Sequence, residues 1–400
     1  MKAYIVENKK KIEPFDEYPR TCLIKNKPLM ELQKESFSAL GLEPILVSNH
    51  HEVDDPDEYI ILNDSLYFTS ELLEEFILRS KRQRTCTVCA LKAGVTTLRS
   101  ITSVQDVKIG VNYIEYDLCY VPKNKFRGES YPLIIDPDKI QFHIPMPKHV
   151  CGANQYSIPM SDKLIIQINH WVNLWVANIL SLLEIGARLQ KKSIIRKTVL
   201  AIKAMSFNRW TILSQLNKIG ENCDIHPTAY IEGSTIGDNV TVGAGAIIRE
   251  SSIGKNSWIG NDVIIEESVI GKHSTILHGH ILYSVLYPET FSVAQMISAI
   301  LIGKKSFMGS GVTLTDFRLD GKSVMVMRDG IKVDTGNTFV GACIGHEVYL
   351  GSGCILAPGR IIPKGMRITP EKDRIIQKPN KDMLLAFMTT VPKVITVVPS

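Results

Sequence analysis

Two groups of side chains in this 400-residue sequence have types and spacings that suit chemistry. In the first group, Asn169, His170 and Asn173 lie within about one turn of a predicted helix, and Trp171 and Trp175 are four residues apart on another face. Amide and imidazole groups beside indole rings could bind a sugar. A helix buried between domains with paired amides explains the same residues, and we favour that second interpretation.

The cysteines form the second group. There are eight, and the closest pair, Cys86 and Cys89, lies in a segment that alternates polar and apolar residues like a strand. Residues three apart on a strand point to opposite faces, so this pair cannot chelate one metal ion. Scattered cysteines in a chain of this size do not form a disulfide framework, which indicates a reduced, cytoplasmic protein.

The elements that must position any site are indicated by a different pattern, an aliphatic residue at every fifth or sixth position from Ile225 to Ile281. This spacing is typical of short strands that meet at the corners of a triangular prism, with three steps to a coil. A recurring five-residue step gives a 17-residue period, which carries the near-copies IIRESSIG and IIEESVIG. Glycine follows the inward residue where a positive φ or a close neighbouring coil would exclude a Cβ, at Gly237, Gly243, Gly254, Gly260 and Gly271.

The rest of the chain has other signals. The first 160 residues alternate strand and helix patterns, which predicts a mainly parallel sheet flanked by helices. Polar residues interrupt the apolar stretch 164–189, so we predict a buried or connecting helix and no membrane span. The net charge of +5 gives no reason to expect nucleic acid as a partner. We expect four segments, namely an α/β domain (1–160), a helical linker (161–218), a β-helix (219–370) and a tail (371–400).

Several phrases resemble those of one family. Coils with the phrase S-x-I-G, which begins at Ser251 and Ser268, resemble the C-terminal left-handed β-helix of sugar-1-phosphate nucleotidylyltransferases. The segment 18–29 resembles the family phrase P-K-x-L-L-P-V-x-x-K-P-L, and 61–64 resembles its strand-end G-D turn. The order of segments is similar to that in GlmU-like and archaeal bifunctional nucleotidylyltransferase/amino-sugar acetyltransferase proteins. This resemblance implies a Rossmann-like nucleotidyltransferase α/β domain followed by an all-β left-handed parallel β-helix of hexapeptide repeats.

The resemblance also implies a site in the first domain. Asp64 would hold Mg²⁺, and Arg20, Lys27 and Asn63 would contact the nucleotide or the sugar phosphate. Where the family has a G-x-G-T-R loop after the first strand, residues 7–15 contain no glycine. Residues that carry a Cβ keep backbone amides away from phosphates, so nucleotidyl transfer lacks one of its expected parts.

For the β-helix, the resemblance implies acyl transfer from acetyl-CoA or another acyl-CoA. This reaction needs a base, and a histidine is the usual one because its pKa lies near neutrality. Val293 and Gln295 stand where the family has its histidine, and we consider His278, His280 and His346 as substitutes.

Further contacts follow from the same resemblance. Asp316, Arg318 and Asp320 match the family phrase N-L-R-F-D loosely and would line a sugar pocket, while Arg360 and Lys364 would lie near coenzyme A phosphates. Related β-helices bury one flank against partners, so we expect a homotrimer with closed symmetry.

Three functions stay open. The first is a sugar-1-phosphate nucleotidylyltransferase-like transferase that forms or binds a nucleotide sugar, with acyl transfer as a second activity. The second is a CoA-dependent sugar acyltransferase whose first domain only binds. The third is a non-catalytic assembly or regulatory subunit, which the missing glycine loop and the missing histidine favour.

Overall fold

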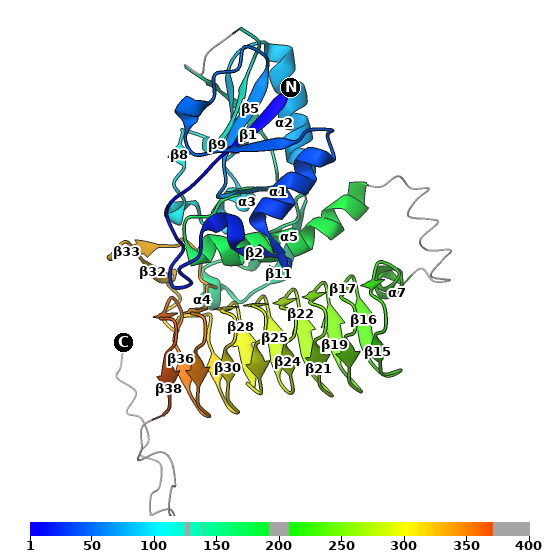
Figure 1. Ribbon diagram of the computed structural model, residues 1–400. Coiled ribbons are helices and arrows are strands. Elements are labelled where there is room, and N and C mark those ends of the chain that lie inside the picture. Colours follow the sequence, from blue (N-terminus) through cyan, green and yellow to red (C-terminus); the bar gives the residue numbers. More distant parts are fainter. Residues whose placement is uncertain (125–128, 139, 192–207, 371–400) are drawn as a thin grey trace, which may run out of the picture.

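The computed structural model describes all residues except 125–128, 139, 192–207 and 371–400. The predicted tail and part of the predicted linker therefore lie outside the described residues. An α/β domain sits on a long β-helix, and helix α5 (Trp171–Lys191) runs between them (Figure 1). Among the described helices, none combines the length and the apolar character that a membrane crossing requires.

The first domain is built on a sheet in the order β10-β7-β9-β5-β1-β4, with β8 paired to β9. The predicted parallel pairing is confirmed for β1 with β4 and β5 and for β7 with β10, and β9 runs antiparallel, which makes the sheet mixed. The strands are β1 (Lys2–Val6), β4 (Pro44–Val47), β5 (Tyr59–Asn63), β7 (Thr87–Lys92), β8 (Lys108–Ile109), β9 (Tyr113–Val121) and β10 (Tyr131–Ile135).

Helices cover one face of this sheet. Phe37 of α1 and Leu72 and Phe76 of α2 share an apolar core with Ile5 and Ile60 of the sheet. The described helices are α1 (Leu29–Ser38), α2 (Ser70–Gln83), α3 (Val95–Arg99), α4 (Lys148–Cys151), α5 and α7 (Arg209–Ser214), with short 3-10 turns at Pro19–Thr21, His50–Glu52 and Thr102–Val104. Four small pairs complete the connections, namely β2 (Leu23–Ile24) with β3 (Lys27–Pro28), β6 (Leu66–Phe68) with β13 (Ile165–Gln167), β11 (Gln141–Pro145) with β12 (Gln155–Pro159), and β32 (Met325–Arg328) with β33 (Ile331–Asp334).

The second domain is the predicted left-handed β-helix, with three parallel sheets of eight, eight and seven strands. The first sheet contains β14 (Lys218–Ile219), β17 (Thr235–Ile236), β20 (Ser252–Ile253), β23 (Val269–Ile270), β26 (Val285–Leu286), β29 (Leu301–Ile302), β34 (Cys343–Ile344) and β37 (Ile361–Ile362). The second contains β15 (Asp224–Ile225), β18 (Thr241–Val242), β21 (Trp258–Ile259), β24 (Thr275–Ile276), β27 (Phe291–Ser292), β30 (Phe307–Met308), β35 (Tyr349–Leu350) and β38 (Arg367–Ile368). The third contains β16 (Tyr230–Glu232), β19 (Ile247–Arg249), β22 (Ile264–Glu266), β25 (His280–Leu282), β28 (Met296–Ser298), β31 (Thr313–Leu314) and β36 (Ile355–Leu356).

The register of the coils confirms the 17-residue period. Ile253 pairs with Ile270, and both side chains are almost fully buried inside the prism. One coil later the period shortens, because Ile270 pairs with Leu286, which is 16 residues further on. The inward aliphatic column therefore stays continuous although the chain between its members varies in length.

The glycines follow the inward residues because neighbouring coils are close. A Cβ added to Gly254 would lie 2.3 Å from the backbone nitrogen of Lys272 on the next coil. Left-handed backbone occurs instead at corner residues such as Asn239 and Asn256, with φ angles of 55° and 57°. Asparagine adopts this conformation more readily than most residues, and the two side-chain amides bond to each other at 3.1 Å.

The segment between β1 and the 3-10 turn at Pro19 joins the two domains. Phe15 is 2% exposed and stacks on Tyr287 of the β-helix, with ring centres 5.6 Å apart. His346 lies 4.9 Å from the Phe15 ring, and Glu17 forms an ion pair with Lys304. The two domains therefore share one apolar core, to which helix α5 also contributes.

Replacing Phe15 with alanine tests this shared core. We expect Phe15→Ala to lower the free energy of unfolding by about 3–5 kcal/mol, because it leaves a cavity beside Tyr287 and His346. Urea denaturation measures the change. The matched control is Phe142→Ala, since Phe142 is 50% exposed, and it should cost less than about 0.5 kcal/mol. Equal losses in the two variants would contradict the shared core.

Candidate functional site

The first candidate site lies at the point in the sheet where the order of successive strands reverses. From β1 the chain crosses to β4 on one side, and β5 then pairs on the other side of β1. In open α/β sheets, ligands bind outside the carboxyl ends of the strands at such a switch point. Glu7 and Asn8 follow β1 and Asp64 follows β5, so this crevice is bordered by polar residues.

Asp64 is the centre of this polar group. Its side chain is fully buried, and Oδ1 accepts a hydrogen bond from the backbone N–H of Asn8 at 3.0 Å. Arg20 lies in the 3-10 turn Pro19–Thr21, and its Nη1 donates to Glu7 Oε1 at 2.8 Å and to Asp64 Oδ2 at 3.4 Å. The Gln33 side chain donates to the backbone carbonyl of Asp64, which fixes the turn after β5.

Burial raises the pKa of Asp64 to about 6, because removal from water disfavours the charged form. The hydrogen bond from Asn8 and the positive charge of Arg20 act in the opposite direction. Arg20 is therefore the described cation that stabilises this buried carboxylate.

The residues here do not fit the Mg²⁺ ion that the resemblance implies. Both oxygens of Asp64 already have protein partners, and its side chain has no exposed surface. Within the described part of the chain, no three or more His, Cys, Asp or Glu side chains gather into a metal site. A hard cation such as Mg²⁺ would need an unoccupied carboxylate oxygen as a ligand. Here the guanidinium of Arg20 already contacts Oδ2 of Asp64.

Of the residues that the sequence analysis considered for this site, the structure brings Arg20 and Asp64 together as an ion pair, and Lys27 and Asn63 have other partners. Lys27 forms an exposed ion pair with Glu35 of α1. Asn63 accepts hydrogen bonds from the backbone and the hydroxyl of Ser65 and so shapes the turn. Glu7, which the sequence reasoning missed, is the second carboxylate on Arg20.

The Asn169–Asn178 patch is a seam between the domains. The side chain of Asn178 donates to the carbonyl of Leu23, and its oxygen accepts from the N–H of Lys25. The ring of His170 contacts the carbonyl of Met327 at 2.9 Å, and burial lowers the pKa of His170 to about 4. The helix is buried between the domains, as the favoured interpretation expects, and Asn178 and His170 have partners, whereas Asn173 Oδ1 and Trp171 Nε1 are buried without a hydrogen bond.

The second candidate site lies on the outer face of the β-helix. Nε2 of His280 is 2.9 Å from Oε2 of Glu266 on the neighbouring strand, and the His280 side chain is 33% exposed. Arg249 donates to Oε1 of Glu266 at 3.0 Å and to Glu232 at 2.6 Å. Glu232, Arg249 and Glu266 thus form a ladder of alternating charge across three coils, and His280 on the fourth coil contacts its last carboxylate.

The other two candidate histidines have different surroundings. His346 is 2% exposed between the domains, where its Nδ1 accepts from the N–H of Lys304 and its Nε2 lies 3.3 Å from Glu17. His278 is exposed. Sequence reasoning missed Glu266 and Arg249, although the near-copies IIRESSIG and IIEESVIG place these two residues 17 positions apart on one face.

The remaining predicted residues lie in separate places. Asp316 accepts a hydrogen bond from the Ser298 hydroxyl at 2.7 Å, next to helix α5. Arg318 and Asp320 pair with each other in an exposed loop. Arg360 and Lys364 are exposed at the last coils, beside β37 and away from His280 in the order of coils.

A pH titration of stability tests the state of Asp64. Its folded-state pKa is raised above the ordinary value of 3.8, so the native state binds more protons between about pH 4 and pH 6 and stability falls as pH rises through that window. We expect the stability of the wild type minus that of Asp64→Asn to fall by up to about 3 kcal/mol from pH 4 to pH 7. The exposed Asp54→Asn should show no such trend, and a flat Asp64 difference would contradict the burial effect.

Comparison with known proteins adds to this picture. No curated protein sequence matches the chain. Among solved structures, the acetyltransferase domain of PglB from Neisseria gonorrhoeae in complex with acetyl coenzyme A is 17% identical, covers 44% of this chain and 62% of its own, and has a TM-score of 0.16. This chain thus spans 62% of that protein's length. A hexapeptide transferase family protein from Anaplasma phagocytophilum is 18% identical over 43% of this chain and 90% of its own, with a TM-score of 0.17.

A protein-family model matches part of the β-helix. Residues 199–288 match the family described as the GMPPB C-terminal domain. These residues include the first coils of the β-helix and the charged ladder up to His280. The chain thus carries a left-handed β-helix domain of the kind associated with nucleotidyltransferases, which confirms the resemblance drawn from its repeats.

Proposed function

We propose that this protein is a transferase that acts on a sugar phosphate or a nucleotide sugar, and that its first domain binds the anionic part of that molecule at Arg20. The observation that supports this is a guanidinium, 27% exposed, at the carboxyl ends of β1 and β5. Both ion pairs of Arg20 use Nη1, which leaves Nη2 and Nε for a phosphate. Arginine suits this task because its planar fork donates two parallel hydrogen bonds.

The geometry supports binding better than nucleotidyl transfer. Transfer requires a loop that wraps the triphosphate and a cation on the leaving group. Here the loop after β1 is tied to the β-helix, by Phe15 in its apolar stack and by the ion pair of Lys10 with Asp329 at 3.0 Å. The carboxylate of Asp64 is enclosed by its protein partners.

Binding of nucleotide sugars to Arg20 variants tests the proposal. We expect Arg20→Gln to weaken binding of a nucleoside diphosphate sugar by about 10- to 100-fold in isothermal titration calorimetry, because it removes a charge-assisted hydrogen bond. The matched control is Arg82→Gln on the exposed surface of α2, which should leave the affinity unchanged.

A second variant separates binding from folding. Arg20→Lys keeps the charge beside Asp64 but loses the planar fork, so it should retain the melting temperature and still lose affinity. If no nucleotide sugar or sugar phosphate binds the wild type, the proposal fails and the non-catalytic subunit becomes the better explanation.

A second function, acyl transfer to an amino sugar, is favoured by the pair of His280 and Glu266. A carboxylate only accepts hydrogen bonds, so the neutral tautomer that suits this contact donates from Nε2 and would leave Nδ1 to accept a proton. An acyl-CoA, when bound, would supply the activated acyl group as a thioester. The amine nitrogen of the sugar would bond to the thioester carbon, the C–S bond would break, and His280 would carry the proton from the amine to the departing thiolate.

Substitution of the pair tests this second function. We expect His280→Asn to lower acyl transfer by at least 100-fold and Glu266→Gln to lower it by about tenfold, because the first removes the base and the second only its orientation. Release of free thiol from acetyl-CoA in the presence of an amino sugar is the measurement. The exposed His278→Asn is the matched control and should keep full activity, and an active His280→Asn would exclude the role.

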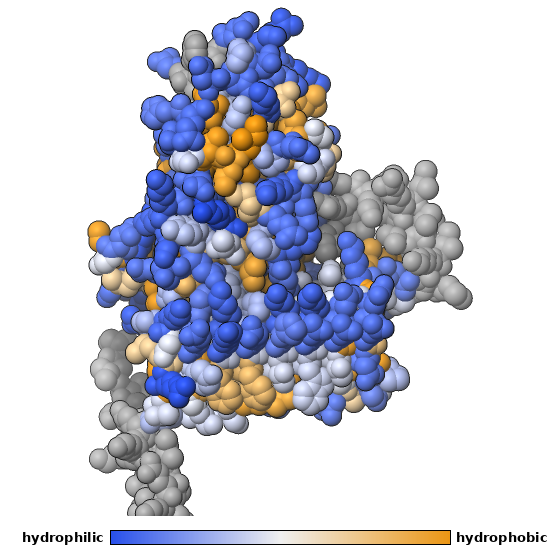
Figure 2. All heavy atoms as spheres, in the orientation of Figure 1, coloured by the Kyte–Doolittle hydropathy of each residue, from blue (hydrophilic) through white to orange (hydrophobic). Residues whose placement is uncertain are grey.

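The expected homotrimer has support in a stripe of aromatic side chains on the second sheet of the β-helix. The rings of Phe291 and Phe307 stack at 5.5 Å, and those of Phe307 and Tyr349 at 6.0 Å. Trp258 on the same sheet is 49% exposed, and Figure 2 shows hydrophobic residues on this lower side of the β-helix. The rings cover one another's faces, so the stripe presents edges that suit another protein surface better than a sugar. We infer that copies of this chain contact one another at this stripe, and light scattering would measure the resulting oligomeric state.

We also infer that the protein acts in the cytoplasm, where its free cysteines stay reduced.

A further inference from the structure

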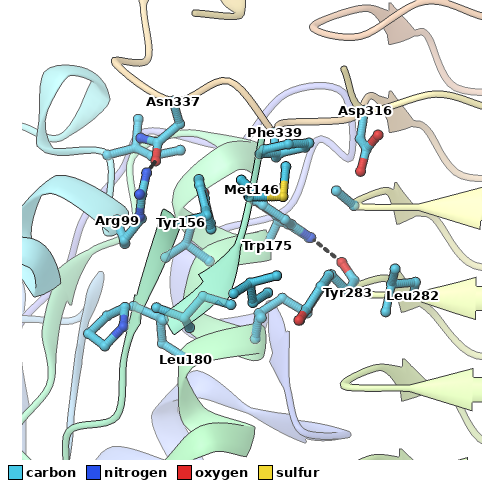
Figure 3. A pocket seen from close by; sticks show the side chains of 17 residues that line it. Arg99, Met146, Tyr156, Trp175, Leu180, Leu282, Tyr283, Asp316, Asn337 and Phe339 are labelled. Atoms are coloured by element: carbon cyan, nitrogen blue, oxygen red, sulfur yellow. Dashed lines mark hydrogen bonds between the residues drawn. The ribbon is translucent and has the colours of Figure 1, made fainter. Parts of the chain in front are cut away.

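A pocket lies between the two domains, at a place that neither candidate site includes. Its volume is about 230 Å³, and it is bordered by the hairpin β11–β12, helix α5 and the third sheet of the β-helix (Figure 3). Well-packed interiors contain few voids larger than a water molecule. The lining is mostly aliphatic and aromatic, and its principal side chains are Ile144, Ile158, Trp175, Leu180, Leu282 and Tyr283.

Several polar groups of the lining are engaged with other protein groups, and among them the Asp316 carboxylate accepts a hydrogen bond from the Ser298 hydroxyl at 2.7 Å. The indole N–H of Trp175 donates to the carbonyl of Tyr283 at 2.7 Å (Figure 3). The guanidinium of Arg99 lies over the ring of Tyr156 at 3.8 Å and donates to Asn337 at 2.6 Å. These contacts hold the walls in place and leave an apolar interior. The mostly apolar lining therefore favours a hydrocarbon group, because a polar group would lose hydrogen bonds to water that most of this wall does not replace.

The pocket borders the charged pair of the second candidate site. Leu282, which lines the pocket, is two residues after His280 on β25, so the two side chains point to the same face of the sheet. Two residues along a strand correspond to about 6.5 Å. Glu266 is the direct neighbour of Leu282 on the adjacent strand. The base and its orienting carboxylate are thus next to the apolar wall.

We propose that this pocket binds the hydrocarbon part of an acyl chain whose carbonyl end lies toward His280. The inference rests on the proposed acyl transfer, and it names the acyl donor as one with a chain longer than acetyl. An apolar cavity of 150 Å³ holds the six carbons of benzene, so by the same ratio this pocket holds roughly nine carbon atoms.

Binding of acyl-CoA thioesters of increasing chain length to the full chain tests this inference. We expect the affinity measured by calorimetry to rise by roughly fourfold for each added methylene between acetyl-CoA and octanoyl-CoA. The rise should stop in longer thioesters such as dodecanoyl-CoA, because the pocket is then full. Free octanoic acid is a separate probe. If octanoic acid binds as tightly as octanoyl-CoA, the result would support the pocket and identify free fatty acids as its source of acyl chains.

Two variants fill the pocket from opposite walls. Ile158→Trp and Leu282→Trp should each weaken octanoyl-CoA binding at least tenfold and leave acetyl-CoA binding unchanged. The matched control is Ile355→Trp, which is 76% exposed on the same sheet and should alter neither affinity. Melting temperatures identify a variant that does not fold. In that case octanoyl-CoA binding by the other tryptophan variant tests the pocket.

The outcomes separate this inference from the function on which it rests. A rise of affinity with chain length but no thiol release supports the pocket and removes acyl transfer. Thiol release from acetyl-CoA without any dependence on chain length keeps acyl transfer and overturns the pocket. The inference is also overturned if both tryptophan variants bind octanoyl-CoA like the wild type.

Discussion

The apolar contact between the α/β domain and the β-helix is the interaction on which the rest of the structure depends. Trp171 and Leu174 of helix α5 are completely buried in a core that also contains Phe15 from the first domain and Tyr287 and Leu301 from the β-helix. Large buried side chains contribute most of the stability of such a contact, at about 1.5–3 kcal/mol each. Both candidate sites and the pocket take their shape from this contact, because each is bordered by residues that it immobilises.

This contact changes what the first domain can do. In a nucleotidyltransferase, the segment after the first strand must close over a triphosphate, which requires glycine and freedom to move. Here the same segment contributes Ile12 and Phe15 to the shared core and Glu17 to an ion pair with Lys304. Release of the loop would expose these apolar side chains to water. The phosphate binding proposed above would therefore rely on groups that are already in place, such as Arg20.

The sequence predicted the β-helix well because its geometry allows little variation. Each coil must direct one aliphatic side chain into the interior from each of its three sides. The spacing of Ile253, Ile259 and Ile265 is therefore enough to predict the triangular prism. Asp64 and Arg20 were found through a family phrase, since 44 residues separate two side chains that meet at 3.4 Å. The local pattern contains nothing that would bring such positions together.

The contacts that escaped prediction are those between distant segments. Phe15 meets His346 from the other end of the chain, and no local periodicity reports a pairing of that kind. The pocket is lined by several segments between Arg99 and Phe339, and their order in the sequence does not indicate that they lie close together. The pair of His280 and Glu266 is an intermediate case, since the repeat fixes which strands are neighbours, but the shortened step after Ile270 obscures which outward side chains align.

The charges around Arg20 link anion binding to protonation. With both carboxylates ionised, Glu7, Asp64 and Arg20 together carry one net negative charge, which opposes the approach of a phosphate. Burial raises the pKa of Asp64 to about 6, so this carboxyl can take a proton at a small cost near neutrality, and the cluster then becomes neutral. A phosphate on the free side of the guanidinium would raise that pKa further, because it adds negative charge nearby. If Arg20 binds a phosphate as proposed, protonation of the buried Asp64 carboxylate would remove the negative charge that opposes that binding.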